Sequence, residues 1–379
     1  MFSTLWNAFT PHPKGPTKQL PPASLNAIAA HTEDPTVKAF AACYDDNCTP
    51  RDTVIDSLPT IESYRAPKYP IVLCHGLSGF DRLILIPSLR NLINLILQHI
   101  HSNNADHFMD KEESAEQPGG DLVTVDYWIG IRELLEKNGC TVLTARVPSF
   151  GSIEERAAAL HGILKRKTAE QLGSTRDPPT EKHPARVNLI AHSMGGLDAR
   201  YLISRIPSSE KNYEVVSLTA ISTPHQGSEM ADFVVENFQL MKTLLAKKQP
   251  VLPICFYQLT TNYMRHFFNL VTPDDPAVHY FSYGSNFTPK WYSVFNMSWQ
   301  VIYERSGGQD NDGMVTVQSA HWGEYMGTLH NMDHLDVINW QNKLIRNNGL
   351  AQAGPLQHPP IDILQFYLTI THNLAQRGF

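Results

Sequence analysis

The stretch VNLIAHSMGG, residues 187–196, constrains the fold of this chain more than any other feature. An uninterrupted apolar run, typical of a buried strand, leads into Ser193 and then directly into a helical pattern. Small residues two positions before and after the serine, Ala191 and Gly195, allow a strand and a helix to approach closely at a sharp turn. Such a turn would expose the serine hydroxyl. A serine that only caps an ordinary helix of a doubly wound sheet fits these ten residues equally well.

Apolar runs and helical patterns alternate along the chain. Apolar runs bounded by glycine, proline or polar residues predict buried strands at 69–76, 140–148, 185–193 and 213–223. Helical patterns occur between and after them, at 127–139, 152–167 and 195–206. Gly139 predicts a C-terminal cap, and Ser152 with Glu155 predicts an N-terminal capping box. This alternation predicts an α/β fold with a mostly parallel sheet and helices on both faces.

Composition narrows the function classes. The chain has 379 residues, 42% of them hydrophobic, and a net charge of −6 without a long basic run, so a nucleic-acid partner is not expected. The most apolar stretch, 83–100, contains Pro87 and Arg90 and does not predict a membrane span. The N-terminus lacks signal-peptide and transit-peptide features, so we expect an intracellular protein, cytoplasmic, lipid-associated or mitochondrial, rather than a secreted one. Five cysteines do not predict a disulfide framework, and Cys74 and Cys140 are expected in buried strands.

The chain is expected to divide into an arm and one large domain. Residues 1–66 are proline-rich and lack periodicity, which predicts an N-terminal arm. Residues 67–379 would form the α/β domain, with polar insertions within 84–123 and at 168–184. A further segment, 232–260, begins with a helical pattern. Its apolar face would consist of Val234, Phe238, Met241 and Leu245.

The stretch CHGLSGF, residues 74–80, predicts a second part of a site at the serine turn. A strand that ends in His-Gly is where an α/β-hydrolase places one backbone N–H that binds an oxyanion. The N–H groups of Leu77 and Met194 are therefore the expected donors, each worth about 2.7–4 kcal/mol of the barrier. His75 and His192 are expected to be structural, because they flank the oxyanion residue and the serine.

The segment 310–340 supplies an acid and a base. Asp312 and His334 follow Ser193 in the chain order of α/β-hydrolases, which is serine, acid, histidine. His334 would take the proton from the serine, while Asp312 would fix its tautomer and stabilise its charged form. Asp310 and His330 are the alternatives, and they rank lower because they lack the D-G and H-L-D contexts.

With these motifs the sequence resembles the triacylglycerol lipases of the Pseudomonas and Burkholderia type and related fungal lipases, which have the α/β-hydrolase fold. The matching stretches occur in the same order: HGLSGFD, VDYWIGIRELLEKNGCTVLTARVPSF, VNLIAHSMGGLDARYL, STPHQGSEMADF, NDGMV and NMDHLDVIN. The resemblance implies hydrolysis of acylglycerol esters through an acyl-enzyme, with Ser193, Asp312 and His334 as the triad. It implies Leu77 and Met194 as oxyanion donors. It also implies a lipid ester substrate, contact with a lipid–water interface or membrane surface, and a lid within 232–260. A second apolar stripe, at 84–102, is the lower-ranked alternative for the lid.

The sequence departs from that family in several places. The stretch between GFD (79–81) and DYW (126–128) is longer, the proline-rich arm is additional, and no cysteine pair matches the bacterial disulfide. Asp336 matches one calcium ligand of the family, but residues 279–300 contain no Asp or Glu to supply another. Calcium takes several oxygen ligands. We therefore expect no required cofactor, with calcium at Asp336 as the alternative.

Other functions share the same triad. A phospholipase, an acyltransferase or a carboxylesterase without lipid preference would use these residues equally well, because pocket shape selects the substrate and the acceptor. A hydrolase fold that only binds a ligand is disfavoured, because none of the triad positions has lost its residue.

Overall fold

The computed structural model describes residues 53–77, 127–172, 184–244, 252–290, 293–340 and 361–379. Contacts divide the chain into two units, Met1–Asp52 and Thr53–Phe379, and all described residues belong to the second. The expected insertion at 84–123 and most of the expected arm therefore lie outside the described residues, as do Cys43 and Cys48.

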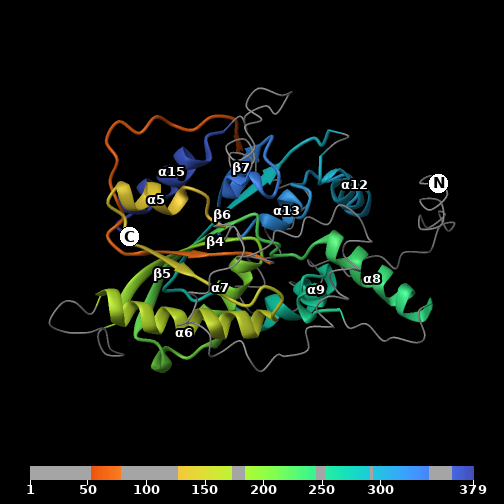
Figure 1. The fold of residues 1–379 in the computed structure, drawn as a ribbon, viewed down its shortest axis with the longest axis horizontal. Helices are drawn as coiled ribbons and strands as arrows, with labels where there is room; N and C mark the ends of the chain where they lie inside the picture. The colour runs from red at the N-terminus through yellow and green to blue at the C-terminus, as the bar shows by residue number, and fades with distance from the viewer. Residues whose placement is uncertain (1–52, 78–126, 173–183, 245–251, 291–292, 341–360) are drawn as a thin grey trace, which may run out of the picture. The chain divides into compact units, whose positions relative to one another are not determined.

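A seven-stranded parallel sheet forms the centre of the second unit, in the order β1-β7-β6-β5-β4-β2-β3 (Figure 1). The strands are β1 (Val54–Ile55), β2 (Ile71–Cys74), β3 (Val142–Ala145), β4 (Ala185–His192), β5 (Tyr213–Ile221), β6 (His279–Asn286) and β7 (Glu324–His330). The predicted parallel α/β architecture is confirmed. Because all strands run in the same direction, their carboxyl ends meet at one edge, where ligands of such sheets bind.

Two residues of the expected arm belong to this sheet. Val54 pairs with Thr328 and Ile55 with Leu329, so that β1 forms the edge beside β7. The sheet thus begins before residue 67, although a two-residue strand is too short to be read from sequence periodicity.

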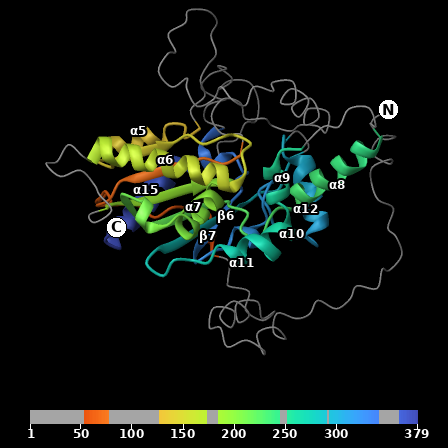
Figure 2. The same cartoon turned by 90° about the horizontal axis from the view of Figure 1, so that it is seen from below.

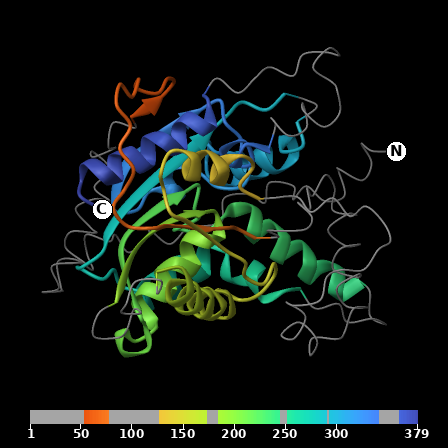
Figure 3. The ribbon, with the colours of Figure 1, turned by 60° about the vertical axis from the view of Figure 1, so that its left-hand side comes forward.

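Helices cover both faces of the sheet, as Figures 1 and 3 show. One face carries α5 (Ile131–Lys137) and α15 (Ile363–Gln376), and the other carries α6 (Ile153–Leu172) and α7 (Met194–Arg205). Each pair packs with strand residues in its own apolar cluster. Two faces buried in this way explain why β2, Ile71–Cys74, is apolar and buried at every position.

Local capping predictions are confirmed at both ends of the helical segments. Ser152 Oγ accepts from the Glu155 N–H at 3.1 Å, and Glu155 Oε2 accepts from the Ser152 N–H at 2.8 Å, which forms a capping box at the start of α6. Gly139 ends the α5 segment with φ 87°, a conformation that glycine adopts without strain. Helix α6 continues to Leu172, so the loop predicted at 168–184 begins later.

A third group of helices lies beyond the carboxyl edge of the sheet (Figure 2). It contains α8 (Glu229–Leu244), α9 (Ile254–Gln258), α10 (Thr261–Tyr263), η3 (Met264–Phe268), α11 (Asn269–Val271) and α12 (Asn296–Arg305). Short helices complete the described elements: η2 (Ser208–Glu210), α13 (Val317–Ala320) and η4 (Asp336–Ile338). Of the described helices, none is long and apolar enough to cross a membrane.

Helix α8, at the start of the segment expected to be a lid, is attached to its neighbours by two polar contacts. Asp232 accepts hydrogen bonds from the N–H and the hydroxyl of Thr261, at 2.9 and 2.7 Å. Glu236 forms an ion pair with Arg305 of α12 at 2.5 Å. Two residues of its expected apolar face, Val234 and Phe238, are buried.

Candidate active site

The serine turn is strained, as a nucleophile elbow requires. Ser193 has φ 56° and ψ −132° between the end of β4 and the start of α7, a conformation that is rare outside glycine. A Cβ atom placed on Gly195 would lie only 2.6 Å from the Cys74 carbonyl oxygen, which belongs to the neighbouring strand β2. The small residue after the serine is therefore needed for the helix to pass β2, and the alternative of an ordinary helix cap does not explain it.

The structure brings Ser193, His334 and Asp312 into one hydrogen-bonded chain. His334 Nε2 lies 3.0 Å from Ser193 Oγ, and His334 Nδ1 lies 2.8 Å from Asp312 Oδ2. A carboxylate only accepts hydrogen bonds, so Nδ1 carries the proton and Nε2 is free to accept from the serine. Three side chains, of which His334 lies 141 residues from Ser193 and 22 from Asp312 along the chain, thus have the geometry of a nucleophile, a base and an acid.

Asp312 is buried, and both of its carboxylate oxygens accept hydrogen bonds. Its Oδ1 accepts from the N–H groups of Met314 and Val315, at 2.9 and 2.8 Å. Its Oδ2 accepts from Ser285 Oγ at 3.1 Å in addition to His334. The His334 N–H also donates to the Asp312 carbonyl oxygen at 2.9 Å, which ties the two loops together.

The loop that carries His334 is held by two acidic side chains. Asp333 Oδ1 accepts from the N–H groups of Leu335 and Asp336, and Asp336 Oδ2 accepts from the Asp333 N–H at 3.0 Å. This reciprocal arrangement resembles a capping box at the start of η4. Burial raises the pKa of Asp333 to about 6, although the backbone N–H groups and His334 act in the opposite direction.

Leu77 and Met194 lie on either side of the serine. Gly76, which precedes Leu77, is so close that an added Cβ would lie 2.7 Å from Ser193 Cβ, and Met194 follows the serine at the first position of α7. Within the described residues, neither the Leu77 nor the Met194 N–H donates to a protein acceptor. Both groups are thus available to a ligand atom at the serine.

Comparisons with known proteins agree with this arrangement. Residues 162–320 match the family model "Putative serine esterase (DUF676)". The chain is 53% identical over 329 residues to Triacylglycerol lipase 2 of Saccharomyces cerevisiae, covering 86% of this chain and 98% of that protein. The chain belongs to the triacylglycerol lipase family. It is accordingly an ester hydrolase.

More distant relatives extend the comparison. The chain is 25% identical over 317 residues to a triacylglycerol lipase of Pseudomonas fragi, covering 72% of this chain and 88% of that protein. It shares its fold with lipase 1 from Pelosinus fermentans, at a TM-score of 0.50 and 17% identity over 82% of this chain and 99% of the other. The resemblance to bacterial lipases seen in the sequence motifs is confirmed, as is the α/β-hydrolase fold.

A buried arginine is bonded to the main chain just before Leu77, the expected oxyanion donor. Arg156 of α6 pairs with Asp198 of α7 at 2.7 Å, and both side chains are almost fully buried. The same guanidinium donates to the carbonyl oxygens of Pro148, His75 and Gly76, at 2.8, 2.9 and 3.2 Å. Burial raises the pKa of Asp198 to about 6 despite the neighbouring Arg156 cation.

The two histidines beside the site are structural, as the sequence predicts. His75 Nε2 accepts from the Val147 N–H at 3.1 Å, so its Nδ1 carries the proton and donates to the Gly76 carbonyl oxygen at 2.9 Å. Burial lowers the pKa of His75 to about 3. His192 Nδ1 lies 2.5 Å from the Tyr127 hydroxyl, which also accepts from the Gly76 N–H. Burial, and to a smaller extent the nearby His334, lowers the pKa of His192 well below its usual value.

The alternative acid and base lie elsewhere. Asp310 Oδ2 accepts from Asn286 Nδ2 at 3.1 Å, and His330 Nδ1 lies 2.9 Å from Asn286 Oδ1. The two residues are thus joined through one asparagine, without a hydrogen bond to Ser193. The sequence contexts that favoured Asp312 and His334 therefore selected the pair that reaches the serine.

Asp336, the position of the calcium alternative, belongs to the His334 loop. Its Oδ2 accepts a hydrogen bond from the Asp333 N–H, and its side chain is buried there. Among the described residues, no group of three or more His, Cys, Asp or Glu side chains lies together as a metal site. The expectation that no cofactor is required stays a prediction.

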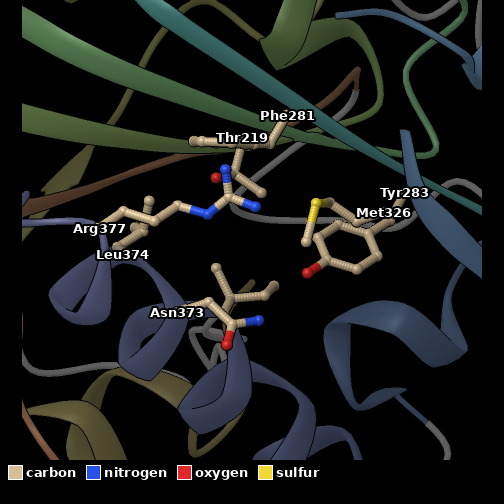
Figure 4. Close-up of a pocket in the computed structure, with 8 residues that line it drawn as sticks. Thr219, Phe281, Tyr283, Met326, Asn373, Leu374 and Arg377 are labelled. Carbon is tan, nitrogen blue, oxygen red and sulfur yellow. The ribbon is translucent and has the colours of Figure 1, made fainter. Parts of the chain in front are cut away.

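A surface pocket lies away from this site, between the sheet and α15 (Figure 4). Arg377, Asn373 and Leu374 face strand residues across it. Its lining includes none of the residues that contact Ser193. We assign it no part in the chemistry.

Proposed function

We propose that this chain hydrolyses the carboxylic esters of acylglycerols, with Ser193 as nucleophile, His334 as general base and Asp312 as the acid that orients it. The observation that carries the proposal is the continuous hydrogen-bonded chain from Ser193 Oγ through His334 to Asp312, with contacts of 3.0 and 2.8 Å. These distances are within the range in which a base activates a serine.

Acylation begins when Ser193 Oγ attacks the ester carbonyl carbon. His334 Nε2 takes the hydroxyl proton as the Oγ–C bond forms, and Asp312 stabilises the imidazolium through Nδ1. The bond between the carbonyl carbon and the alkoxy oxygen then breaks. His334 returns its proton to that oxygen, so the leaving group departs as an alcohol and the acyl group stays on Ser193.

The tetrahedral intermediate carries a negative charge on the former carbonyl oxygen. In this proposal the N–H groups of Leu77 and Met194 stabilise that charge, and Met194 adds the positive end of the α7 dipole. In deacylation a water molecule replaces the alcohol. His334 takes its proton as it attacks, and the proton ends on Ser193 Oγ when the fatty acid leaves.

An apolar environment beside the oxyanion donors supports a long-chain acyl substrate. Met194 packs in the third apolar cluster of the fold, and Leu77 packs against it. The same cluster contains Val234 and Phe238 of α8 and Phe256 of α9. Burial of an acyl chain against such side chains contributes about 0.8 kcal/mol per CH₂ group. The similarity to proteins named triacylglycerol lipases supports the glycerol ester.

The test compares Ser193→Ala with the unaltered protein on three substrates: emulsified long-chain triacylglycerol, phosphatidylcholine vesicles and a short soluble nitrophenyl ester. We expect triacylglycerol to be the preferred substrate of the unaltered protein. The variant should lose about six orders of magnitude in kcat on every substrate. A nitrophenyl phosphonate should add one phosphonyl mass to a peptide that contains Ser193.

The matched control is Ser282→Ala, since Ser282 is a buried serine that bonds the main chain of Trp322. Its rate should stay near that of the unaltered protein. A folded Ser193→Ala protein with a tenth of the original rate would overturn the assignment of the nucleophile. Preference for phosphatidylcholine, or transfer of the acyl group to an added alcohol in place of hydrolysis, would instead overturn the substrate and reaction class.

A further inference from the structure

Two serine hydroxyls form a chain behind the acid of the active site. Ser285, near the end of β6, lies with its Oγ 3.1 Å from Asp312 Oδ2. Ser222, directly after β5, lies with its Oγ 2.7 Å from Ser285 Oγ. Both serines are buried, with exposed fractions of 0% for Ser222 and 1% for Ser285.

The direction of this chain follows from the donors available. A carboxylate only accepts, so the single proton of Ser285 is used in the bond to Asp312. Ser285 Oγ can then only accept from Ser222, and Ser222 must donate. The hydroxyl protons all point toward Asp312, and the chain runs Ser222, Ser285, Asp312, His334, Ser193.

Ser222 is held in place by its own main chain. Its φ of 49° is in the left-handed region, which residues other than glycine and asparagine seldom adopt, and its N–H donates to the Tyr283 carbonyl oxygen at 2.9 Å. Backbone strain of this kind persists where the surrounding structure fixes it, and it is concentrated at functional sites. The main chain therefore fixes the position of the Ser222 hydroxyl, which can in turn orient Ser285.

We propose that Ser285, oriented by Ser222, is a positioning residue that fixes the Asp312 carboxylate against His334. This inference rests on the proposed function, since it acts through the same acid. Asp312 Oδ1 accepts from two backbone N–H groups, whereas Oδ2, among the described residues, accepts only from Ser285 and the imidazole. In the described part of the chain, loss of Ser285 would leave His334 itself as the one donor to the oxygen that orients it.

Two consequences distinguish this role from simple packing. A carboxylate that has lost one of its two side-chain donors orients the imidazole less well, which lowers kcat but leaves substrate binding unchanged. Without the hydrogen bond from Ser285, the negative charge on Asp312 Oδ2 is also less neutralised, so Asp312 stabilises the imidazolium more strongly. The free base then disappears at a higher pH, and the acidic limb of the rate profile moves upward.

The experiment measures kcat, KM and the pH profile of Ser285→Ala on a soluble nitrophenyl ester. We expect kcat to fall about tenfold with KM unchanged, as for the loss of one hydrogen bond to a charged group. The acidic limb should move to higher pH. Ser222→Ala should change both quantities in the same direction by a smaller amount, and Ser285→Thr, which keeps the hydroxyl, should restore most of kcat.

Ser282→Ala is the control for a merely structural effect. It removes a buried hydroxyl from the same strand, β6, and should lower the melting temperature about as much as Ser285→Ala without changing kcat or the pH profile. In an Asp312→Asn background, Ser285→Ala should lower kcat no further, because the two residues act as one unit. A full additional loss there would overturn the inference.

The outcomes also separate this inference from the proposed function. If Ser193→Ala is inactive while Ser285→Ala has the unaltered kcat and pH profile, only the positioning role is wrong. If Ser193→Ala remains active, the triad itself is wrong and the effect of Ser285 must arise elsewhere. An equal loss of melting temperature and kcat in Ser282→Ala and Ser285→Ala would show that both act through stability alone.

Discussion

Replacement of Arg156 by methionine should separate stability from catalysis in this fold. The guanidinium is fully buried and forms its ion pair with Asp198 at 2.7 Å. Its removal leaves a buried carboxylate without its cation and takes a donor from the Gly76 carbonyl oxygen. In a trans peptide that carbonyl and the Leu77 N–H point in opposite directions, so the arginine helps to aim the expected oxyanion donor at the serine.

The two effects differ in size. Removal of one partner of a buried ion pair destabilises a protein by about 3–5 kcal/mol, chiefly through the charge left without a partner. Complete loss of one oxyanion donor lowers kcat by about 10²–10³. His75 still holds the Gly76 carbonyl in Arg156→Met. The N–H of Leu77 is therefore only loosened, and we expect kcat to fall by about tenfold to a hundredfold, less than for complete loss.

The stability change should depend on pH. Asp198 has a pKa raised by burial to about 6, above its unfolded value of about 3.9. The folded state therefore binds a proton that the unfolded state lacks between those values, and stability falls as pH rises through that window. Without Arg156 the pKa of Asp198 rises further. Stability of Arg156→Met should then continue to fall to a higher pH than stability of the unaltered protein.

Urea unfolding at several pH values, together with kcat on a soluble ester, measures both effects. The decisive control is the double variant Arg156→Met with Asp198→Leu. Replacement of both partners by apolar side chains removes the unpaired charge and should recover most of the stability. It does not restore the donor to Gly76, so kcat should stay low. Recovery of kcat along with stability would refute the role of Arg156 at the oxyanion segment.

Two further predictions concern the metal and the access to the site. Prolonged dialysis against EDTA should change neither activity nor melting temperature, because residues 279–300 contain no Asp or Glu to supply a second carboxylate ligand beside Asp336; loss of both, restored by calcium alone, would contradict this. Phe238→Asp on α8 should weaken the rise in rate that accompanies substrate aggregation more than it weakens hydrolysis of a short soluble ester. Equal losses on the two substrates would make Phe238 a core residue of an ordinary esterase.

Several parts of this molecule could be predicted because they depend on residues close together in sequence. The elbow needs a small residue at Gly195, two positions after the serine, and the capping box needs Ser152 and Glu155 three positions apart. A glycine in the left-handed conformation, such as Gly139, can end a helix regardless of where that helix packs in the fold. The order of Ser193, Asp312 and His334 reflects the order of the strand ends in this fold, so the motif contexts could select the acid and the base before their distances were known.

The sequence thus determined the strand–turn–helix at the serine, the fold class and the three residues of the proposed triad, since each depends on local geometry or on chain order. Tertiary structure alone decided the roles of Arg156, Tyr127 and Ser285. An arginine in an amphipathic helix predicts a solvated side chain, and a serine in a strand predicts nothing specific. Arg156 meets Gly76 across 80 residues and Ser285 meets Asp312 across 27. Contacts at such separations form only when the sheet assembles and the side chains are buried. No short-range sequence pattern shows which side chains will then meet.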